Sequence, residues 1–462
     1  MPDLAGRKIV VLGLGIAGLA TVRFLKEQGA RVAVSEARPA TALSDEEQRE
    51  LAGLELETGG HSDDFVLGAD CIVPGPGVPL DLPVLEKARE RGIALLGELA
   101  LAAGRFSVPV IAVTGSNGKT TVTGLIGELL RAAGRQPFVG GNIGTPLLEA
   151  LTGEQNHDVV VLELSSFQLD LSGQFRPDVG LLLNLSPDHL DRHGTMEQYT
   201  AAKMRLFRHQ HQEDIAIFGS DDSELIRLAQ RVQARVHTFG HHRDDQARII
   251  ERRIRLTKGG REYWFELAGT RLDTGMVNRL NAAAALLGAA PLVDDPALLQ
   301  QGLERFQPAE HRMTAVATIR GVHFINDSKA TNVGAMEAAI ASCPDRAVLI
   351  AGGQAKGGDF TGLRPTVAAR VKHILAMGEA AEQIRASFGD LVPVTDVTDM
   401  DMAVTRGFTL AEPGDTVLLA PGCASFDMFA NYGHRGRVFT QSVQDLEQRI
   451  ASEHGELQGE RV

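Results

Sequence analysis

Short runs of apolar residues alternate with amphipathic stretches in the N-terminal part of the chain. Lys8–Leu12, Arg31–Ser35 and Asp70–Val73 have the length and composition of buried strands, and Ile16–Gln28 has the spacing of a helix. Strands that alternate with helices are typical of βαβ units around a parallel sheet. We therefore predict that residues 1–97 form a Rossmann-like domain.

The same alternation predicts a second α/β block over residues 98–308. Its clearest helix is expected at Thr120–Ala133, where apolar residues recur at helical spacing. Residues 247–267 differ, because an alternating pattern breaks at Lys258-Gly259-Gly260 and so favours a hairpin. We predict a parallel sheet with a small antiparallel appendage; the parallel strands are expected at Val108–Val113, Val159–Leu162 and Val179–Leu183.

A third α/β block is predicted over residues 309–462, beyond the linker-like segment Arg305–Pro308. Its apolar runs again alternate with helical stretches and are expected to form strands at Val322–Ile325, Ala347–Ala351, His373–Ala376 and Thr416–Ala420. The predicted fold class is therefore α/β with three domains, of which the first and the third are Rossmann-like.

Composition narrows the class of protein. A chain of 462 residues is too long for one hydrophobic core of ordinary size, and 44% hydrophobic with 23% charged residues is usual for globular proteins. The net charge of −13 argues against bulk binding to nucleic acid or anionic membranes, because phosphate backbones are held by Lys and Arg. A local phosphate site stays possible, since backbone N–H groups can form one.

The cysteines and the N-terminus bear on the cell compartment. The apolar run Ile9–Ala20 follows Arg7-Lys8 as in a signal peptide, but three glycines interrupt it. Elsewhere no apolar stretch reaches the length of a membrane span. We expect a reduced, cytoplasmic protein without membrane insertion, since its cysteines are far apart and match no metal-binding spacing: Cys71, Cys343 and Cys423.

A glycine-rich motif, Gly13-x-Gly15-x-x-Gly18, follows the first predicted strand and opens a helix, and Glu36 ends the next strand. Glycines at this spacing permit a tight turn and the close approach of a diphosphate to a helix N-terminus. One interpretation is an NAD or FAD site with Glu36 on a ribose. The other is a Rossmann-like turn that binds no dinucleotide, and the motif alone favours neither.

The segment TGSNGKTT, Thr114–Thr121, lies between a predicted strand and a predicted helix. Backbone N–H groups and the helix dipole can hold phosphates there, Lys119 can neutralise terminal oxygens, and the Thr120 hydroxyl can hold Mg²⁺. Its spacing departs from the standard phosphate loop, because Val113 stands where glycine is required. Gly-Lys-Thr-Thr at a helix start still predicts binding of ATP or GTP, and hence a P-loop-type ATPase domain.

Polar residues follow two further strands of the central block. Glu163 ends one of them and is suitably placed to hold or orient a metal ion beside the phosphate loop. The segment Asn184–His193 follows the other, and its histidines and aspartates fit a metal site or a polar surface loop equally well. Lys203 lies in a predicted helix, where a single lysine is normally a solvated surface residue.

Three polar or glycine-rich loops follow strands of the third block, at 326–332, 352–358 and 421–427. Open α/β sheets bind ligands at the carboxyl ends of their strands. Because Lys329 and Lys356 lie in these loops, we expect an anionic ligand there, facing the nucleotide. His311-Arg312 adds positive charge just beyond the predicted linker.

Together these segments resemble the Mur ligases, the ATP-dependent ligases of peptidoglycan synthesis. The resemblance covers essentially the whole chain, in the expected order of three domains. It rests on TGSNGKTT at 114–121, GGNIG at 140–144, ELSSFQL at 163–169, DHLDRH at 188–193, YTAAK at 199–203, NDSKATN at 326–332 and CASFD at 423–427.

The resemblance implies ligand sites in all three domains. The first domain would hold the uridine diphosphate of a substrate, and not NAD, near Ile16, Ala17, Glu36, Arg38 and Gly77. ATP would contact Gly115, Ser116, Asn117, Gly118, Lys119, Thr120, Thr121, Asn278, Arg312, Asp327 and Lys329. The substrate or its metal ion would face Asn142 and His189. The incoming glutamate would contact Thr331, Lys356, Ser425 and Phe426.

It also implies two Mg²⁺ ions, one on Thr120 and Glu163 and one on His189 and Lys203. An ordinary lysine, with a pKa of about 10.4, is cationic and would be repelled by Mg²⁺. We therefore expect Lys203 to be carbamylated, so that it offers an anionic oxygen. The catalytic residues implied are Lys119, Glu163, His189 and Lys203.

The function implied is joining of glutamate, with the D isomer expected, to UDP-N-acetylmuramoyl-L-alanine through an acyl phosphate made from ATP. We expect a monomer. Two departures from the family pattern concern Met276-Val277 before Asn278, where Gln-His is common, and Gln354-Ala355, where an acidic residue and glycine are frequent.

Several alternatives remain open at this point. Within the superfamily they are another amino-acid-adding ligase, an L-glutamate-adding variant and a folate polyglutamate synthetase, although ELSSFQL and CASFD favour a glutamate-adding Mur ligase. Outside it, a NAD-dependent oxidoreductase would use the glycine-rich turn but leave TGSNGKTT unexplained. A non-catalytic nucleotide switch is the third class.

Overall fold

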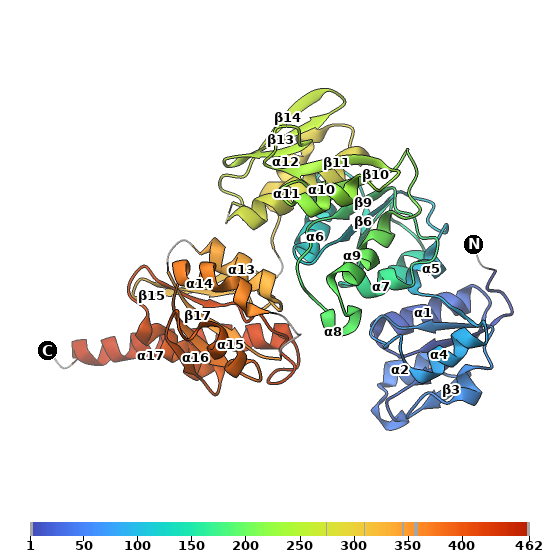
Figure 1. The fold of residues 1–462 in the computed structure, drawn as a ribbon, viewed down its shortest axis with the longest axis horizontal. Coiled ribbons are helices and arrows are strands. Elements are labelled where there is room, and N and C mark those ends of the chain that lie inside the picture. Colours follow the sequence, from blue (N-terminus) through green and yellow to red (C-terminus); the bar gives the residue numbers. More distant parts are fainter. Residues whose placement is uncertain (1–2, 274, 309, 344–345, 355–358, 460–462) are drawn as a thin grey trace. The chain divides into compact units, whose positions relative to one another are not determined.

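The computed structural model describes residues 3–459 except 274, 309, 344–345 and 355–358. Three sheets with flanking helices follow one another along the chain, which confirms the predicted α/β fold with three domains (Figure 1). By the packing of the backbone, the chain divides into two compact units. The first comprises Met1–Asn184, Thr200–Thr270 and Leu280–Phe306, and the second Leu185–Tyr199, Arg271–Arg279 and Gln307–Val462.

The first sheet is parallel, with its five strands in the order β3-β2-β1-β4-β5. The apolar runs predict β1, β2 and β4, but not β3, which is polar and partly exposed, nor β5, which has two residues. The strands are β1 (Lys8–Leu12), β2 (Arg31–Glu36), β3 (Glu55–Thr58), β4 (Cys71–Pro74) and β5 (Ala94–Leu95), and the helices α1 (Ile16–Glu27), α2 (Asp45–Glu50), α3 (Asp63–Val66) and α4 (Pro83–Glu90).

The second sheet has nine strands, in the order β14-β13-β12-β11-β10-β9-β6-β8-β7. Helix α5 (Glu98–Ala102) precedes it in the chain. Its strands are β6 (Val110–Thr114), β7 (Pro137–Gly141), β8 (Val159–Glu163), β9 (Val179–Leu182), β10 (Ile215–Gly219), β11 (Arg235–Gly240), β12 (Ala247–Ile250), β13 (Arg253–Lys258) and β14 (Arg261–Glu266). Its principal helices are α6 (Lys119–Ala132), α7 (Ser166–Asp170), α8 (Leu190–His193), α9 (Met196–Met204), α10 (Ser223–Ala229), α11 (Met276–Ala289) and α12 (Leu299–Arg305).

The predicted hairpin between β13 and β14 is confirmed. Lys258 pairs with Arg261, and both intervening residues, Gly259 and Gly260, have positive φ, as a tight two-residue turn requires. These antiparallel strands are the predicted appendage, and they extend the edge of the parallel sheet, because β12 pairs in parallel with β11 and antiparallel with β13.

The third sheet follows the order β15-β16-β20-β17-β18-β19, with an antiparallel pair β15-β16 at one edge. Its strands are β15 (Thr314–Ile319), β16 (Val322–Asn326), β17 (Ala347–Gly352), β18 (Val371–Met377), β19 (Val394–Asp396) and β20 (Thr416–Leu419). Its principal helices are α13 (Val333–Ser342), α14 (Arg364–Arg370), α15 (Ala381–Phe388), α16 (Met400–Leu410) and α17 (Tyr432–Gly459). The pattern does not predict β15, whose side chains are mostly exposed or half-buried.

The strands that lead into the central loops are buried along their whole length. Every residue of β6, β8 and β9 is buried, which explains why they appear in the sequence as continuous apolar runs instead of alternating ones. The linker predicted at Arg305–Pro308 begins within a helix, since Arg305 ends α12 and Phe306 is buried.

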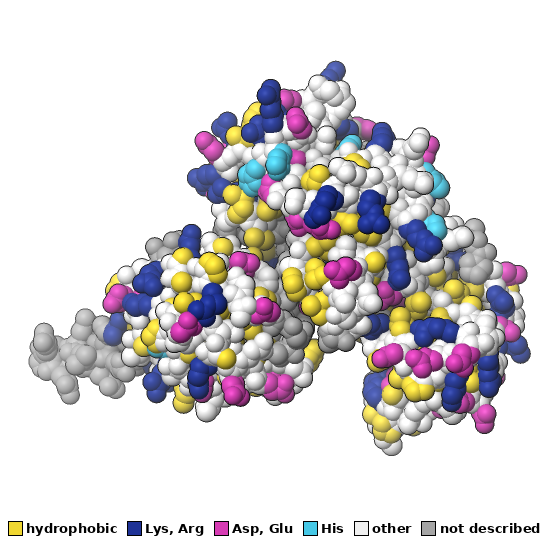
Figure 2. Space-filling model, viewed as in Figure 1, with side chains coloured by type: hydrophobic (Ala, Val, Ile, Leu, Met, Phe, Trp, Pro, Cys, Tyr) yellow, Lys and Arg dark blue, Asp and Glu magenta, His cyan; other side chains and the backbone are white. Residues whose placement is uncertain are grey.

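Surface and cysteine features agree with the composition. On the face shown in Figure 2, acidic and basic side chains are interspersed. In the described part of the chain no helix combines the length and the apolar character needed to cross a bilayer. All three cysteines are buried thiols.

Candidate functional site

Glycine is required at two positions of the turn between β1 and α1. Gly13 has φ of +84°, a left-handed conformation that residues with a side chain rarely adopt. A Cβ on Gly18 would lie 2.1 Å from the Gly13 carbonyl oxygen, so a side chain there would push the helix away from the turn. The spacing of the motif therefore serves a tight strand-to-helix turn, as predicted.

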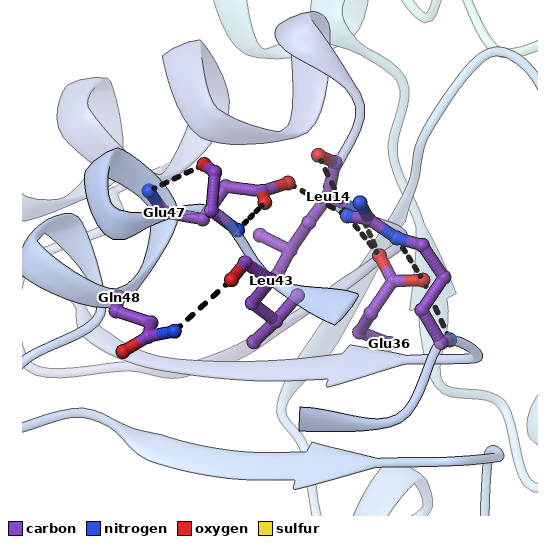
Figure 3. A network of polar contacts seen from close by, with 7 residues as sticks. Leu14, Glu36, Leu43, Glu47 and Gln48 are labelled. Atoms are coloured by element: carbon purple, nitrogen blue, oxygen red, sulfur yellow. Dashed lines mark hydrogen bonds and ion pairs between the residues drawn. The ribbon is translucent and has the colours of Figure 1, made fainter. Parts of the chain in front are cut away.

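Glu36, at the end of β2, holds this turn in place (Figure 3). One carboxylate oxygen accepts a 2.7 Å hydrogen bond from the Leu14 N–H, and the other accepts one of 2.9 Å from the Arg38 N–H. The Arg38 guanidinium forms ion pairs with Glu36 at 3.2 Å and with Glu47 at 2.7 Å. Burial alone would raise the pKa of Glu36, but the hydrogen bonds from Arg38 and Leu14 together lower it.

A pocket of about 540 Å³ opens beside this network. Its lining includes Ile16, Ala17, Glu36, Arg38 and Gly77, which are all the residues implied for the uridine diphosphate. The side of the pocket formed by Ile16 is apolar, and this residue is 75% exposed. One cavity thus combines an apolar wall, a helix start and a guanidinium.

The phosphate loop joins β6 to α6 and contains two glycines with positive φ, Gly115 and Gly118. Gly118 is the N-cap of α6 and has φ of +83°. A Cβ there would lie 2.4 Å from the Asn281 Oδ1 of α11, so this side chain packs directly against the loop. The loop therefore depends on glycine for its backbone and for close contact with α11.

Asn184, just after β9, fixes the first half of the loop. Its carbonyl oxygen accepts from the Ser116 N–H at 3.1 Å, and its side chain exchanges hydrogen bonds of 2.8 and 3.1 Å with the Asn117 backbone. Lys119 folds back over the loop, and its Nζ donates to the carbonyl oxygens of Gly115 and Ser116, both at 2.8 Å. The shape of the loop is therefore fixed by contacts within the protein, and the Lys119 ammonium is held against the loop backbone.

Glu163 ends β8, the strand beside β6, and its side chain is 2% exposed. Its Oε1 accepts from the Asn142 Nδ2 at 2.9 Å, and the Asn142 N–H donates to the Glu163 carbonyl at 2.9 Å. Oε2 is buried and has no hydrogen-bond partner among the residues that the structure describes. A buried carboxylate oxygen is costly to leave unpaired, so this atom is a natural metal ligand.

Lys203, in α9, is not the solvated residue that its isolated position suggests, because it is 1% exposed. Its Nζ donates to the Gly115 carbonyl at 2.9 Å and lies 3.5 Å from the Thr114 Oγ1. The surface interpretation of Lys203 is therefore wrong. The first unit brings together Lys119, Asn142, Glu163 and Lys203 around the loop that also carries Ser116, Asn117, Thr120 and Thr121.

His189 belongs to the second unit and has a left-handed backbone, with φ of +55°, at the start of α8. Its Nε2 lies 3.6 Å from the Asp188 Oδ2, which also accepts a 2.9 Å hydrogen bond from the Asn332 side chain. A positive φ outside glycine is uncommon, and such strain is frequent at functional sites. Asn278, in the first turn of α11, also belongs to this unit.

Arg312 and Asp327 lie close enough to interact electrostatically in the second unit. Burial raises the pKa of Asp327 to about 6, although the charge of Arg312 and the Met313 N–H act in the opposite direction. The Arg312 Nε is buried without a hydrogen-bond partner among the described residues. The Arg312 guanidinium can therefore donate a further hydrogen bond to a polar ligand.

The loops after β16 and β20 are tied together by Arg435, a residue that the sequence patterns did not identify. This residue is 1% exposed, and its guanidinium donates to the Ser328 carbonyl at 2.8 Å and to the Cys423 carbonyl at 3.2 Å. Burial lowers its pKa to about 10. No local signal could have suggested this role, because Ser328 lies 107 positions from Arg435 in the sequence.

The predicted glutamate and nucleotide contacts of these loops differ in exposure. Lys329 donates to the Tyr432 hydroxyl at 3.0 Å, and its ammonium lies 4.4 Å from the centre of that ring. Ser425 is buried, whereas Phe426 is 69% exposed. The Thr331 N–H bonds to the Lys329 carbonyl at 2.8 Å. Lys356 lies outside the described residues, while Gln354 exchanges two backbone hydrogen bonds of 2.9 Å with Ala424.

No group of three or more His, Cys, Asp or Glu side chains that could enclose a metal ion occurs in the described ranges. Asn184 and Asn281 are the other functional candidates that the sequence alone did not identify. Asn184 could have been found, since it follows a strand adjacent to β6.

Known sequence families match the chain in three consecutive segments. Residues 7–97 match the family described as Mur ligase MurD-like, N-terminal domain, residues 113–290 match the Mur ligase middle domain, and residues 311–423 match the Mur ligase glutamate ligase domain. These segments follow the order of the three sheets.

Individual proteins are similar over nearly the whole length. The UDP-N-acetylmuramoylalanine--D-glutamate ligase of Desulfotalea psychrophila is 43% identical over 440 residues, which cover 95% of this chain and 96% of that protein. The enzyme of the same name from Desulfosudis oleivorans is 41% identical over 450 residues, covering 96% and 98%. The solved structure of a pseudomurein peptide ligase type C from Methanothermus fervidus has a TM-score of 0.61 at 19% identity, covering 96% and 100%, and shares the fold.

Proposed function

The chain belongs to the Mur ligase family, among the UDP-N-acetylmuramoylalanine--D-glutamate ligases, and we propose how its residues divide the reaction between them. It is an ATP-dependent ligase that joins D-glutamate to UDP-N-acetylmuramoyl-L-alanine in peptidoglycan synthesis. The observation that carries the proposal is the phosphate loop, against which Lys203 is buried and beside which Glu163 ends the next strand.

The reaction needs activation because a carboxylate is a poor electrophile towards an amine. Transfer of the γ-phosphoryl group of ATP to the substrate carboxylate gives an acyl phosphate and ADP, which replaces one difficult step by two easier ones. The amine of D-glutamate then attacks the acyl carbon, and phosphate leaves. Lys119 already sits over the loop carbonyls, and in the proposal its ammonium moves to the phosphoryl oxygens, where negative charge develops.

The residues around Glu163 fit a divalent cation. Glu163 offers its unpaired buried Oε2, while Asn142 holds the other carboxylate oxygen and so fixes the orientation of the group. Thr120, in the first turn of α6, supplies a hydroxyl, as expected for a phosphate loop. A Mg²⁺ ion held by these two residues would neutralise charge on the phosphate oxygens.

We assign a second ion to His189 and Lys203. Lys203 would serve as a carbamate, because an ammonium group repels a cation, and its burial against the phosphate loop would place a carbamate oxygen beside the bound phosphates. Activity of Lys203→Ala should be largely lost and partly restored by short carboxylic acids. Failure of any such acid to restore activity would argue against the ligand role.

The N-terminal pocket is assigned to the uridine diphosphate of the substrate. Glu36 uses both carboxylate oxygens on Leu14 and Arg38, so its part is to shape the turn and to orient Arg38. Ile16, Ala17 and Gly77 line the same cavity. A dinucleotide is not needed to account for the glycines.

The second unit is assigned to the remaining contacts. Arg312, Asp327, Lys329 and Asn278 would bind ATP, and Thr331, Lys356, Ser425 and Phe426 would bind glutamate. Two observations support this assignment: Arg312 interacts electrostatically with Asp327, and Arg435 joins the loops after β16 and β20 by hydrogen bonds. We also propose that the protein acts in the cytoplasm and as a monomer, in agreement with its three buried thiols and its composition.

Phosphate release tests the function directly. The purified chain is mixed with ATP, Mg²⁺ and UDP-N-acetylmuramoyl-L-alanine, and phosphate is measured with D-glutamate, L-glutamate, L-alanine or no amino acid. We expect release with D-glutamate alone. Release with L-glutamate only would move the chain to a variant specificity, and the absence of release with either glutamate would refute the proposal.

A further inference from the structure

Glu98, the first residue of α5, is a buried carboxyl group that the proposed reaction does not use. Only 4% of the residue is exposed, and its Oε2 accepts a 3.3 Å hydrogen bond from the Gln168 Nε2. Its Oε1 is buried and has no hydrogen-bond partner among the described residues. Burial raises the pKa of Glu98 to about 7, although the hydrogen bond from Gln168 lowers it. A group this costly to bury suggests a role beyond packing.

Gln168 connects Glu98 to the N-terminus of α7 through hydrogen bonds to Ser165. Its Oε1 accepts from the Ser165 N–H at 3.0 Å, and the Gln168 N–H donates to the Ser165 hydroxyl at 3.2 Å. These are the two bonds of a capping box. The amide of glutamine can be turned end for end, but its NH₂ needs an acceptor. Because Glu98 accepts from Nε2, it is Oε1 that faces Ser165.

The capped residue is two positions from Glu163. Between them Leu164 is held on both sides, because its N–H donates to the Val113 carbonyl at 2.8 Å and its carbonyl accepts from the Thr114 hydroxyl at 2.9 Å. On the other side of Glu163 stands Asn142, at 2.9 Å. The segment that presents the Glu163 carboxylate is therefore anchored at both ends, and its far anchor depends on Glu98.

We propose that Glu98 is a positioning residue for the Glu163 carboxylate and acts through the side chain of Gln168 and the Ser165 cap. The inference rests on the proposed role of Glu163 as a ligand of Mg²⁺. Without Glu98 the buried amide of Gln168 has no acceptor and can reverse, so its NH₂ faces the Ser165 N–H. The start of α7 then loosens, and the Glu163 oxygen is held less firmly for the ion.

A merely structural role predicts a different result. Removing one partner of a buried hydrogen bond leaves the other unpaired and costs stability, whereas replacing both partners by apolar groups can be nearly neutral. If Glu98 served stability alone, Glu98→Leu would lower the melting temperature but leave the Mg²⁺ dependence of the folded protein unchanged. If Glu98 positions Glu163, Glu98→Leu weakens Mg²⁺ binding even when the protein stays folded.

The test compares Glu98→Leu, Glu98→Gln and Gln168→Leu with a control, Gln210→Leu. Gln210 is also buried in the central domain and donates to the carbonyls of Pro177 and Ile215. Two properties are measured for each variant: the Mg²⁺ concentration that half-saturates ADP binding, by calorimetry, and kcat with the KM for the UDP substrate.

We expect Glu98→Leu and Gln168→Leu to raise the half-saturating Mg²⁺ concentration and to lower kcat, each by about tenfold, with an unchanged KM for the UDP substrate. Glu98→Gln, which keeps an acceptor oxygen for Gln168, should stay within about twofold of the original chain, and Gln210→Leu should keep its Mg²⁺ dependence. Unaltered Mg²⁺ dependence in Glu98→Leu, or an equal change in Gln210→Leu, would overturn the proposal.

The proposal can still be tested if one of the variants does not fold. Should Glu98→Leu not fold, Gln168→Leu, which keeps Glu98, tests the same link to Mg²⁺ binding. The ADP measurement needs no amino acid or UDP substrate. A chain that releases no phosphate with D-glutamate therefore refutes the proposed function while the link between Glu98 and Mg²⁺ affinity can still be measured.

Discussion

The turn after β1 and the phosphate loop after β6 both connect a buried parallel strand to the start of a helix, and both contain glycines with positive φ. Their anchors differ in charge. The turn after β1 is held by the carboxylate of Glu36, and the nearby Arg38 is paired with Glu36 and Glu47. The phosphate loop is held by the neutral amide of Asn184 and contains Lys119.

In our proposal one backbone geometry serves two different ligands, and the difference in anchors suits this. A carboxylate anchor offsets the positive potential of a helix start, whereas an amide anchor leaves it in place. The phosphate loop, with its own ammonium, therefore suits a polyphosphate whose charge shifts between oxygens during the reaction. The turn after β1, where Arg38 is already paired with two carboxylates, suits a diphosphate whose charge stays constant.

Removing the cation from the phosphate loop should have the largest effect. In Lys119→Met the developing charge on the phosphoryl oxygens loses its neutralising group, and we expect kcat to fall by about a thousandfold. Phosphate release at saturating substrates measures it. Lys87→Met is the control, since Lys87 is a surface residue paired with Asp63. A variant of Lys119 that retained a tenth of the activity would contradict the comparison.

Two buried carboxyl groups, Glu98 and Glu36, should also respond differently to pH. The pKa of Glu98 is raised from 4.5 to about 7, so the folded protein retains a proton that the unfolded chain loses in that window. The stability of the protein should therefore fall as the pH rises from about 4.5 to 7, by about 3 kcal/mol at full ionisation.

Glu98→Gln cannot ionise and should escape this loss. Its melting temperature should match that of the original chain at pH 4.5 and exceed it at pH 8, as measured by calorimetry. Glu36→Gln should behave oppositely, because the pKa of Glu36 is lowered and its contribution to stability is present above the unfolded pKa. Equal pH dependence in the two variants would contradict the assignment.

Two glycine substitutions in the turn after β1 test whether its tight backbone contact stabilises the protein. Gly18→Ala should destabilise the protein by about 2 kcal/mol, because the new Cβ would meet the Gly13 carbonyl and force the helix to shift. Gly15→Ala is the matched control, since a Cβ at Gly15 has no atom within 4 Å. Urea unfolding of both variants measures the difference, and equal stabilities would show that the turn can relax.

The smallest effect is expected for the carboxylate anchor itself. In Glu36→Gln the amide can still accept from Leu14 but pairs less strongly with Arg38, so the KM for the UDP substrate should rise by about tenfold, or 1.4 kcal/mol. Both kcat and the KM for ATP should stay unchanged, in contrast with Lys119→Met. A larger effect on kcat than on KM would indicate that Glu36 acts on the reaction itself.

Residues at strand ends are the part of the site that could be predicted. Lys119, Glu163 and Asn184 follow apolar runs, and parallel pairing of β6 with β8 and β9 brings those ends to one edge of the sheet. The register between strands need not be known for this, because every parallel strand delivers its carboxyl end to the same side.

Residues that act across long separations could not be predicted. Arg435 contacts Ser328 over 107 positions and Glu98 contacts Gln168 over 70, and neither contact follows from a local pattern. The burial of Lys203 is of the same kind, since its helix shows no apolar face in the sequence that demands it. Such contacts depend on how helices pack on a sheet, which distant parts of the chain decide together.

The sequence by itself determined the α/β class, the strands that carry the loops and the chemistry of the phosphate loop, because apolar runs and glycine positions are local constraints on the backbone. The tertiary structure alone decided that Glu36 turns both oxygens to its own chain, that Lys203 is buried against Gly115, and that Glu98 stands behind Gln168. These arrangements arise from packing, where a polar group finds its partner only after the sheets and helices have come together.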